Sequence, residues 1–488
     1  MRKAILLAGL SALAGCNFTP KYVQPAAPIA ATFPEATAGT RAASEIGWRE
    51  FFGDPRLQAY LAAALANNRD LAQSVARVAQ ARAQYRITDA DRLPQVEAVA
   101  GATRTRQPIN ALGFPIGGTG TDSGAGAGTG TPTPTTTPDA FTINQFSLGV
   151  QVPSYELDFW GRLRNTSEAA RREYLATVEA ERAFRISLVA QVAATYLQIR
   201  AGEEQIALAE RTLAGRRDAV TIARKRMDAG VTSTVDFDQA RLLVTQAETQ
   251  LAELRRTTAQ SENLLTVLVG GPLPGPLPAA RPLSDPGQFA TIEPGLPAAL
   301  LANRPDVLQA EQRLRAANAN IGVARASFLP NITLTGLLGF ISPALGSLVG
   351  GDSLQYRVGA NATQPILTWG KAGAGIALTR AQADELVAAY QKATQTAFRE
   401  VADALVARRR YSEQIVAQGR AIEAQRRLVR VARLRYDNGL SIYLEVLDAE
   451  RSLFAAEQQL LLLRSAQLQN DVSLYTALGG GLKEVSTG

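Results

Sequence analysis

The chain of 488 residues carries an internal repeat, and this repeat constrains its fold more than any other feature. When the sequence is displaced by 209 residues, the Trp-Gly pair at Trp160 falls on the pair at Trp369. The Asp-x-Gly segment that ends at Gly230 then falls on the one that ends at Gly439, and no gap is needed in between. We therefore expect the chain to build the same unit twice.

The upstream parts of the two copies match at a different displacement. Pro94 falls on Pro330 at 236 residues, so the first copy holds 27 more residues than the second between Pro94 and Trp160. The surplus lies in Gly113–Pro138, a run of Gly, Thr, Ser and Pro that is too low in complexity to bury a core. We expect a long exposed loop there, whose counterpart is a shorter turn near 342–352.

Each Trp-Gly pair is followed by a long helical segment. Arg162–Asp228 and its copy Lys371–Asp437 have 67 residues each, which at the rise of an α-helix gives about 100 Å. Both end at Asp-x-Gly, a helix C-terminal signal, and a second helix returns at once. The returning helices alternate spacings of three and four, which indicates a coiled-coil seam rather than an ordinary amphipathic helix. The seam positions are Val244, Ala247, Leu251, Leu254, Thr258, Ser261, Leu265 and Leu268, then Leu453, Ala456, Leu460, Leu463, Gln467, Asn470, Leu474 and Ala477.

Four short stretches have β character, and they predict a barrel that one chain cannot close. They lie at Gln95–Thr105, Thr142–Val152, Asn331–Leu338 and Tyr356–Ile366. An open sheet edge inside a membrane leaves backbone groups unpaired, so other copies of the chain must complete the sheet. Eight strands enclose a lumen filled by side chains, and a conducting pore therefore favours twelve strands and a trimer. The expected fold class is mainly α with a transmembrane β-barrel portion.

The composition excludes several classes of enzyme. Histidine is absent, which removes histidine-based acid–base catalysis, Ser-His-Asp triads and most transition-metal sites. One Cys and two Met are too few for a dedicated soft-metal site. No nucleophile–base constellation is present, so we expect neither catalysis nor a cofactor. The net charge of +7 does not indicate nucleic acid binding, because the Arg residues alternate with Glu and Gln along helical segments.

The N-terminus has the pattern of a bacterial lipoprotein signal. Arg2-Lys3 precedes a short apolar run, and Leu-Ala-Gly then leads into Cys16, the single cysteine. Ordinary cleavage after Ala14 is the alternative, but it would export an unpaired thiol. We therefore expect lipidation of Cys16, and Asn17 at the next position suggests sorting to the outer membrane.

Taken together, these features resemble the TolC/OprM family of outer-membrane efflux factors. The motifs are the lipobox followed by Pro20-x-Tyr22, the duplicated Trp-Gly, and Tyr436-Asp437-x-Gly439 followed by Glu-Val-Leu-Asp-Ala at 445–449. The resemblance covers nearly the whole mature chain. It implies a homotrimer with a twelve-stranded β-barrel in the outer membrane and a long α-helical barrel in the periplasm. The lipid anchor makes the chain more similar to the OprM and NodT branch than to TolC.

The resemblance also implies a function and its partners. The function is the exit duct of a tripartite efflux pump of the resistance-nodulation-division type, a passive conduit for drugs or other small molecules. A periplasmic adaptor protein and, through it, the inner-membrane pump would be the partners. A type I protein-secretion duct is the alternative within the family. A periplasmic adaptor or other coiled-coil structural protein is the alternative outside it, but an adaptor needs lipoyl-type β domains.

The expected organisation has six segments. A Pro-rich linker separates the repeats and, by the resemblance, lies with the terminal segments in a band around the helices. The segments are a signal peptide at 1–15, a lipid-anchored segment at 16–50, the first repeat at 51–270, the linker at 271–287, the second repeat at 288–480 and a tail at 481–488.

The start of the last helix carries a second face. Leu444, Asp448 and Arg451 are spaced by four and three residues, so they share one side of a helix. This side differs from the seam, which extended backwards takes in Ala449, Val446 and Ile442. A solvated patch would have the same spacing, with Glu445 complementing the helix dipole and Asp236 capping with Ser233.

The resemblance assigns roles to these positions. Leu444, Glu445 and Asp448 match residues that line a closed periplasmic aperture, with Leu444 as an apolar ring. Arg451 and Tyr436 match residues that tether the inner helices, and Asp236 lies in the corresponding turn of the first repeat. Ser441 replaces an Arg of TolC, which leaves Arg451 with more of the tether. The turns at Gly230 and Gly439 are expected to meet the adaptor.

Overall fold

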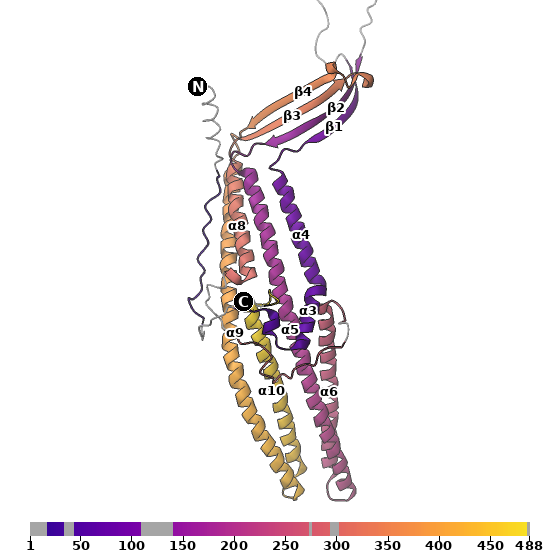
Figure 1. The fold of residues 1–488 in the computed structure, drawn as a ribbon. Coiled ribbons are helices and arrows are strands. Elements are labelled where there is room, and N and C mark those ends of the chain that lie inside the picture. Colours follow the sequence, from indigo (N-terminus) through magenta and orange to yellow (C-terminus); the bar gives the residue numbers. More distant parts are fainter. Residues whose placement is uncertain (1–16, 34–42, 109–139, 273–275, 293–301, 486–488) are drawn as a thin grey trace, which may run out of the picture. The chain divides into compact units, whose positions relative to one another are not determined.

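The computed structural model describes residues 17–33, 43–108, 140–272, 276–292 and 302–485. They form two compact units, each made of several chain segments (Figure 1). The first unit comprises Met1–Pro20, Arg86–Ser167 and Ala319–Thr379, and the second comprises Lys21–Tyr85, Glu168–Asn318 and Arg380–Gly488. Each sequence repeat therefore contributes to both units.

The helices follow the duplication, and the two long ones have the predicted bounds at both ends. These are α5 (Arg162–Asp228) and α9 (Lys371–Asp437). The returning helices are α6 (Thr234–Val269) and α10 (Tyr443–Ala477). In the first repeat α3 (Pro55–Asn67) and α4 (Arg69–Ala90) precede the strands, and in the second α8 (Pro305–Ala326) does. Among the described helices, none is long and apolar enough to cross a membrane.

The first unit holds an antiparallel sheet of four strands in the order β1-β2-β3-β4. The strands are β1 (Glu97–Pro108), β2 (Ala140–Glu156), β3 (Asn331–Ser342) and β4 (Leu354–Thr363). Two short 3-10 turns, Leu345–Ser347 and Gly351–Ser353, connect β3 to β4. All four predicted strands are present, and the mainly α fold with four strands is confirmed.

Of the predicted strand bounds only Asn331 agrees with the structure, and the other seven differ by two to four residues. β4 ends at Thr363 instead of Ile366, because Pro365 has no N–H to donate to a ladder. β2 contains a bulge between Val152 and Tyr155, where the chain places Pro153. Three steps along β2 there oppose two steps along β3, so β2 carries one extra residue.

The bulge changes the alignment of the two repeats within the sheet. Glu97 pairs with Gln151 in the first repeat, and Thr333 pairs with Asn361 in the second. The displacement is therefore 236 on the first strand of each hairpin, as the sequence indicates, but 210 on the second. From Tyr155 onwards, after the bulge, the displacement between the repeats is again 209, the value for the Trp-Gly pairs. One residue of the surplus of the first repeat is thus the bulge.

The coiled-coil seam holds along α6 and at the end of α10, and it shifts over the earlier part of α10. In α6 the predicted seam positions are buried or half-buried, from Val244 to Leu268. In α10 the predicted positions Leu453 to Asn470 are only half-buried. Over this stretch full burial falls one position later at Phe454 and Leu468 and two positions later at Ser465 and Val472, whereas the last two predicted positions, Leu474 and Ala477, are fully buried. Phe454 belongs to one buried apolar cluster with Leu208 and Leu251 of the other hairpin.

The core of the second unit joins the starts of both repeats and the end of the second. The Phe51 ring stacks on Tyr475 at 3.9 Å between centroids and on Phe289 at 5.1 Å. The backbones also pair, since Ala290 N–H donates to Phe51 O at 2.9 Å. Trp48 N–H donates to Lys483 O at 2.9 Å, which brings the segment before the first repeat to the segment after the second.

The ends of α6 and α10 show how closely the repeats correspond. Asn68 Nδ2 donates to the carbonyl of Leu268 at 2.8 Å. Arg304 Nη1 donates to the carbonyl of Ala477 at 3.0 Å. The two donors, Asn68 and Arg304, correspond at a displacement of 236, and the two acceptors, Leu268 and Ala477, correspond at 209. The ends of α6 and α10 are therefore capped at equivalent positions, one by an amide and the other by a guanidinium.

Candidate functional site at the hairpin turns

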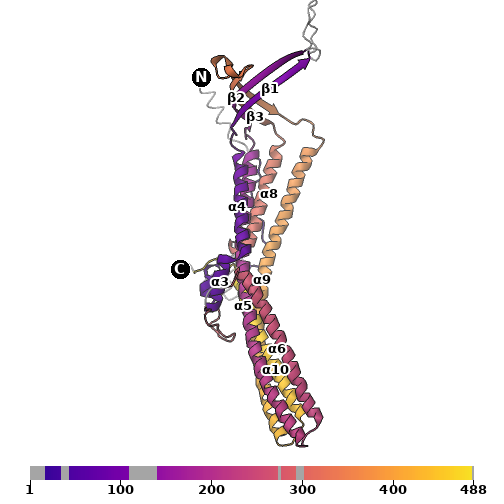
Figure 2. The ribbon, with the colours of Figure 1, turned by 90° about the vertical axis from the view of Figure 1, so that its right-hand side faces the viewer.

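The hairpins α5–α6 and α9–α10 lie side by side in the second unit, and their turns lie at the same end (Figures 1 and 2). Each turn is a Schellman motif with glycine in the left-handed conformation. Gly230 has φ 71° and Gly439 has φ 72°. Val231 N–H donates to Arg226 O at 2.9 Å, and Leu440 N–H donates to Arg435 O at 2.8 Å. The two turns therefore have the same backbone.

The turns present apolar side chains to solvent. Val231 is 64% exposed, Leu440 71% and Ile442 64%. A methyl group built on either glycine would meet no atom within 4 Å. The turns therefore form an apolar, uncrowded surface, and nothing else in the described chain packs against their glycines. Thr232 and Ser441, which correspond at a displacement of 209, each bury a hydroxyl oxygen without a hydrogen-bond partner among the described residues.

A small cluster just inside the turns ties the four helices together. Its buried members come from all of them: Ala223, Ala240, Ala432, Tyr443, Val446 and Leu447. The Tyr436 and Tyr443 rings lie 4.9 Å apart, and the Arg226 guanidinium lies 4.5 Å from the centre of the Tyr436 ring. Tyr436, predicted as a tether, thus connects the end of α9 to α5 through a cation–π contact.

Burial controls the ionisation of these tyrosines. Burial raises the pKa of Tyr443 to about 12, and the charge of Glu450 adds to the rise. Burial also raises the pKa of Tyr436, with Arg226 opposing and Asp236 supporting the rise. Asp236 therefore acts on Tyr436 from the first repeat. The alternative role of Asp236 as a capping partner is not seen, because Ser233 makes no side-chain cap bond.

The predicted second face of α10 is exposed. Leu444 is 47% exposed, and Glu445, Asp448 and Arg451 are exposed as well, whereas Val446 and Leu447 are buried. The seam prediction for Ile442 is wrong. Ile442 is the N-cap of α10 in an extended conformation, so helical periodicity does not reach it, and Tyr443 packs inward instead.

The charged residues on this face pair locally. Arg451 Nη2 lies 2.5 Å from Asp448 Oδ1 within α10, and both side chains are more than half exposed. Glu445 lies 3.4 Å from Arg435, which links α10 to the end of α9. In one chain Arg451 therefore contacts its own helix, and its predicted role as a tether remains a prediction.

Sequence reasoning missed a buried arginine two helical turns further in. Arg216 of α5 is 6% exposed, donates to Leu243 O of α6 at 2.9 Å and lies 5.6 Å from the Phe454 ring of α10. Burial lowers its pKa, and Glu450 opposes this. Glu450 in turn pairs with Arg433 of α9. No sequence signal marks Arg216, because it stands beside Arg217 in a helix rich in arginine.

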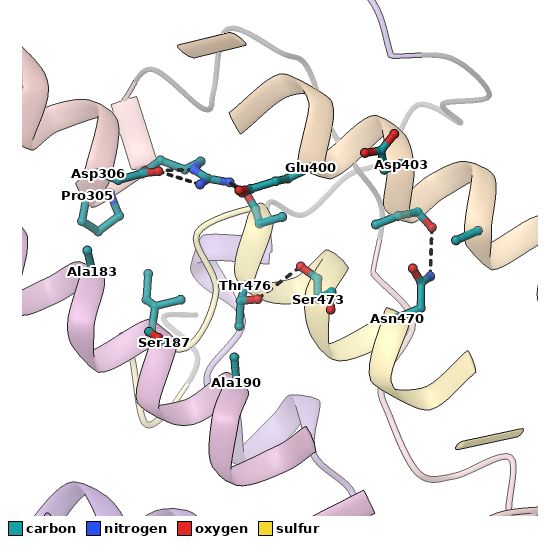
Figure 3. Close-up of a pocket in the computed structure, with 15 residues that line it drawn as sticks. Ala183, Ser187, Ala190, Pro305, Asp306, Glu400, Asp403, Asn470, Ser473 and Thr476 are labelled. Carbon is teal, nitrogen blue, oxygen red and sulfur yellow. Dashed lines mark hydrogen bonds and ion pairs between the residues drawn. The ribbon is translucent and has the colours of Figure 1, made fainter. Parts of the chain in front are cut away.

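A cavity of about 610 Å³ lies in the second unit, away from the turns. Figure 3 shows the residues that line it. Arg304 is one of its lining residues and pairs with Asp306 at 2.6 Å and Glu400 at 2.8 Å. The hydroxyls of Ser473 and Thr476 bond to helix carbonyls, so neither is held as a nucleophile. Within the described residues, no group of three or more acidic or thiol side chains is placed to hold a metal ion.

Three predicted features lie outside the described residues. They are the signal peptide at 1–15, the expected lipidation site Cys16 and the loop Gly113–Pro138. The structure does not bear on any of them.

The comparisons with known proteins agree with one another. The sequence profile described as outer membrane efflux protein matches residues 60–271 and 296–480. The chain is 38% identical to the toluene efflux pump outer membrane protein TtgC of Pseudomonas putida, over 99% of this chain and 97% of that protein. It is 38% identical to the cation efflux system protein CusC of Escherichia coli, over 97% of each. Among solved structures, the open state of the MtrE outer membrane channel of Neisseria gonorrhoeae gives a TM-score of 0.84 at 34% identity, covering 97% of this chain and 100% of that one.

Proposed function

Because the chain belongs to the outer membrane efflux protein family, we propose that it forms the exit duct of a tripartite efflux pump of the resistance-nodulation-division type. It is an outer-membrane protein that extends into the periplasm. The duct conducts drugs or other small molecules outward and catalyses no reaction.

The duplicated hairpin carries this proposal. A tube of helices needs one unit repeated about an axis, and α5–α6 and α9–α10 supply that unit twice per chain with the same turn geometry. Three chains would place six such hairpins around one passage. The four-stranded sheet would likewise be completed to twelve strands in a homotrimer.

The duct does not select the substrate. The relatives at 38% identity are named for toluene and for cations, and each matches nearly the whole chain. Similar ducts thus serve different cargoes, and selection belongs to the inner-membrane pump. The substrate of this duct depends on the pump to which an adaptor connects it.

The turns are the proposed contact with the adaptor. Val231 and Leu440 offer apolar side chains at equivalent positions of the two hairpins, and the open space at Gly230 and Gly439 permits close approach of another backbone. An adaptor can therefore engage both hairpins in the same manner.

The aperture is proposed to close on the exposed face of α10. Leu444, Glu445 and Asp448 lie outside the packed cluster and are free to line a passage formed by three copies. Tyr436 and Arg226 hold the α9–α10 hairpin to the α5–α6 hairpin beside it. The lipid on Cys16 would anchor each chain to the outer membrane in addition to the barrel.

A deletion strain tests the function. We expect loss of the gene to raise sensitivity to small toxic compounds and the wild-type gene to restore resistance. A chemical crosslink should connect the duct to the adaptor of a proton-driven pump. An unchanged resistance profile, together with loss of a secreted protein, would instead assign the chain to type I secretion.

A further inference from the structure

The sheet in the first unit has two edges, β1 and β4, each paired on one side within the described chain. We propose that β4 of one copy pairs with β1 of the next copy in the single register that the internal repeat carries over from the β2–β3 pair. This inference rests on the proposed ring of three copies. It adds which residues meet across each junction.

The β2–β3 pair is itself a junction between repeats. β2 is the last strand of the first repeat, and β3 is the first strand of the second. β4 is the last strand of the second repeat, and β1 is the first strand of the first. Pairing of β4 with β1 of the next copy therefore repeats, between chains, the order that β2 and β3 have within one chain (Figure 1).

The hairpin registers fix the correspondence of the strands. For the part of β2 that precedes the bulge, up to Val152, each residue corresponds to the β4 residue 210 positions later. Each β3 residue corresponds to the β1 residue 236 positions earlier. Val150 pairs with Leu338 in the chain, which places Ala360 opposite Ala102 of the next copy. Val152 pairs with Gly336, which places Ala362 opposite Ala100 of the next copy.

Below the bulge the same result is reached independently. Tyr155 pairs with Leu334, and the displacements there are 209 and 236. They place Gln364 opposite Ala98 of the next copy, two steps beyond the Ala362 pair on both strands. The junction between chains therefore runs without the bulge that interrupts the junction within the chain.

The single extra residue of β2 decides the outcome. If the displacement of 209 were used throughout, Ala360 would lie opposite Gly101 instead of Ala102. A slip of one residue turns every side chain of a strand to the other face of the sheet. The two registers are thus distinguishable by which side chains share a face.

A side-chain contact below the sheet points to the same junction. Trp160 Nε1 donates to the carbonyl of Pro330 at 2.8 Å, across the two repeats. The corresponding residues are Trp369 and Pro94. Trp369 is 88% exposed, and Leu93 beside Pro94 is 68% exposed. The indole N–H of Trp369 therefore donates to the carbonyl of Pro94 of the next copy. The side chains of Trp369 and Leu93 are both covered at this junction.

Four cysteine substitutions test the register. Ala100→Cys and Ala102→Cys lie on one face of β1, and Ala360→Cys and Ala362→Cys lie on one face of β4, all at exposed positions. Directly opposite residues have Cβ atoms about 5 Å apart, and diagonal ones about 7–8 Å. Within one chain β1 and β4 are three strand spacings apart, about 14 Å, so a short thiol reagent can bridge them only between copies.

We expect the pairs 102 with 360 and 100 with 362 to give covalent dimers and trimers in outer membranes. The pairs 100 with 360 and 102 with 362 use the same four substitutions and should crosslink several-fold less. Single variants control for Cys16. Equal crosslinking of all four pairs, or of none in a protein shown to be trimeric by light scattering, overturns the register. A protein that is not trimeric by light scattering overturns the proposed ring instead.

Tryptophan variants test the second contact. Trp369→Phe should lower the temperature at which trimers dissociate in detergent and leave the unfolding of the separated chain unchanged. Trp160→Phe removes the equivalent bond inside the chain and should destabilise the separated chain itself. If Trp369→Phe leaves trimer dissociation unchanged, the contact with Pro94 of the next copy is refuted.

Discussion

Three glycines allow the cost of close packing to be separated from the cost of backbone strain. Gly270 and Gly479 end α6 and α10 with φ of 86° and 84°, and Gly230 ends the turn after α5 with φ of 71°. A methyl group on Gly270 would lie 2.4 Å from the carbonyl oxygen of Asn67, and on Gly479 it would lie 3.0 Å from that of Asn303. On Gly230 it would meet nothing within 4 Å. Substitution by alanine therefore causes a similar backbone strain at all three positions, but a different steric overlap of the new methyl group with its neighbours.

The magnitudes follow from these distances. Alanine in the left-handed conformation costs about 1–2 kcal/mol, which is the whole expected effect of Gly230→Ala. Gly270→Ala adds about 1–3 kcal/mol for overpacking, because the atom that it overlaps belongs to the backbone and cannot rotate away. Gly479→Ala requires a shift of only a few tenths of an ångström and should fall between the other two.

Thermal unfolding followed by the helical circular dichroism signal measures this order. All variants must be compared at one protein concentration, because association shifts the apparent stability. The midpoint should fall least for Gly230→Ala and most for Gly270→Ala. If Gly270→Ala is no more harmful than Gly230→Ala, the close approach of α6 to the end of α3 is not as described.

Four further predictions address the site and the anchor. Leu444→Ala combined with Arg451→Ala should raise single-channel conductance and admit vancomycin to intact cells. The change should be modest, because an exposed ion pair such as Arg451–Asp448 contributes at most about 1 kcal/mol. Unchanged conductance in a folded double variant would place the aperture elsewhere. Gly439→Arg should abolish crosslinking to the adaptor while the trimer stays intact, and a normal crosslink would remove the turn from the docking surface. Cys16→Ser should abolish incorporation of labelled fatty acid, and equal labelling would refute lipidation. Burial raises the pKa of Asp471 from 3.8 to about 6, and the charge of Arg408 opposes the rise. The folded chain therefore binds this proton more tightly than the unfolded chain, and the free energy of unfolding should fall as pH rises between those two values. Asp471→Asn should remove this pH dependence when unfolding is measured across the range.

The sequence predicts the long helices well because their ends are set by local signals. The Trp-Gly pair and the Asp-x-Gly turn stand directly at the bounds of α5 and α9, and the left-handed glycine needs no tertiary contact to be recognised. The end of β4 and the bulge of β2 also have local causes, in Pro365 and Pro153, but a weak strand pattern hides them.

Other features depend on packing that periodicity does not describe. Periodicity alone does not predict the burial of Phe454 in α10, where it joins Leu208 and Leu251 of the other hairpin in one apolar cluster. Arg216 is buried only because α6 and α10 both cover it, and its sequence neighbours resemble those of an exposed arginine. The same holds for Tyr436, whose partner Arg226 comes from the other repeat.

The backbone pairing at the centre of the second unit bears on how freely the gene could be rearranged. Residues 48 and 49 bond to residues 483 and 484, and residue 53 bonds to residue 288, so the points where each repeat starts and where the second repeat stops are neighbours in space. A circularly permuted chain, opened in the linker and joined between those two segments, would keep the strand and helix order that each repeat requires. Either order of the two repeats along the chain is thus compatible with the same fold. Only the lipid proposed on Cys16 would distinguish the two orders, because the permuted protein would carry that membrane anchor on the other half.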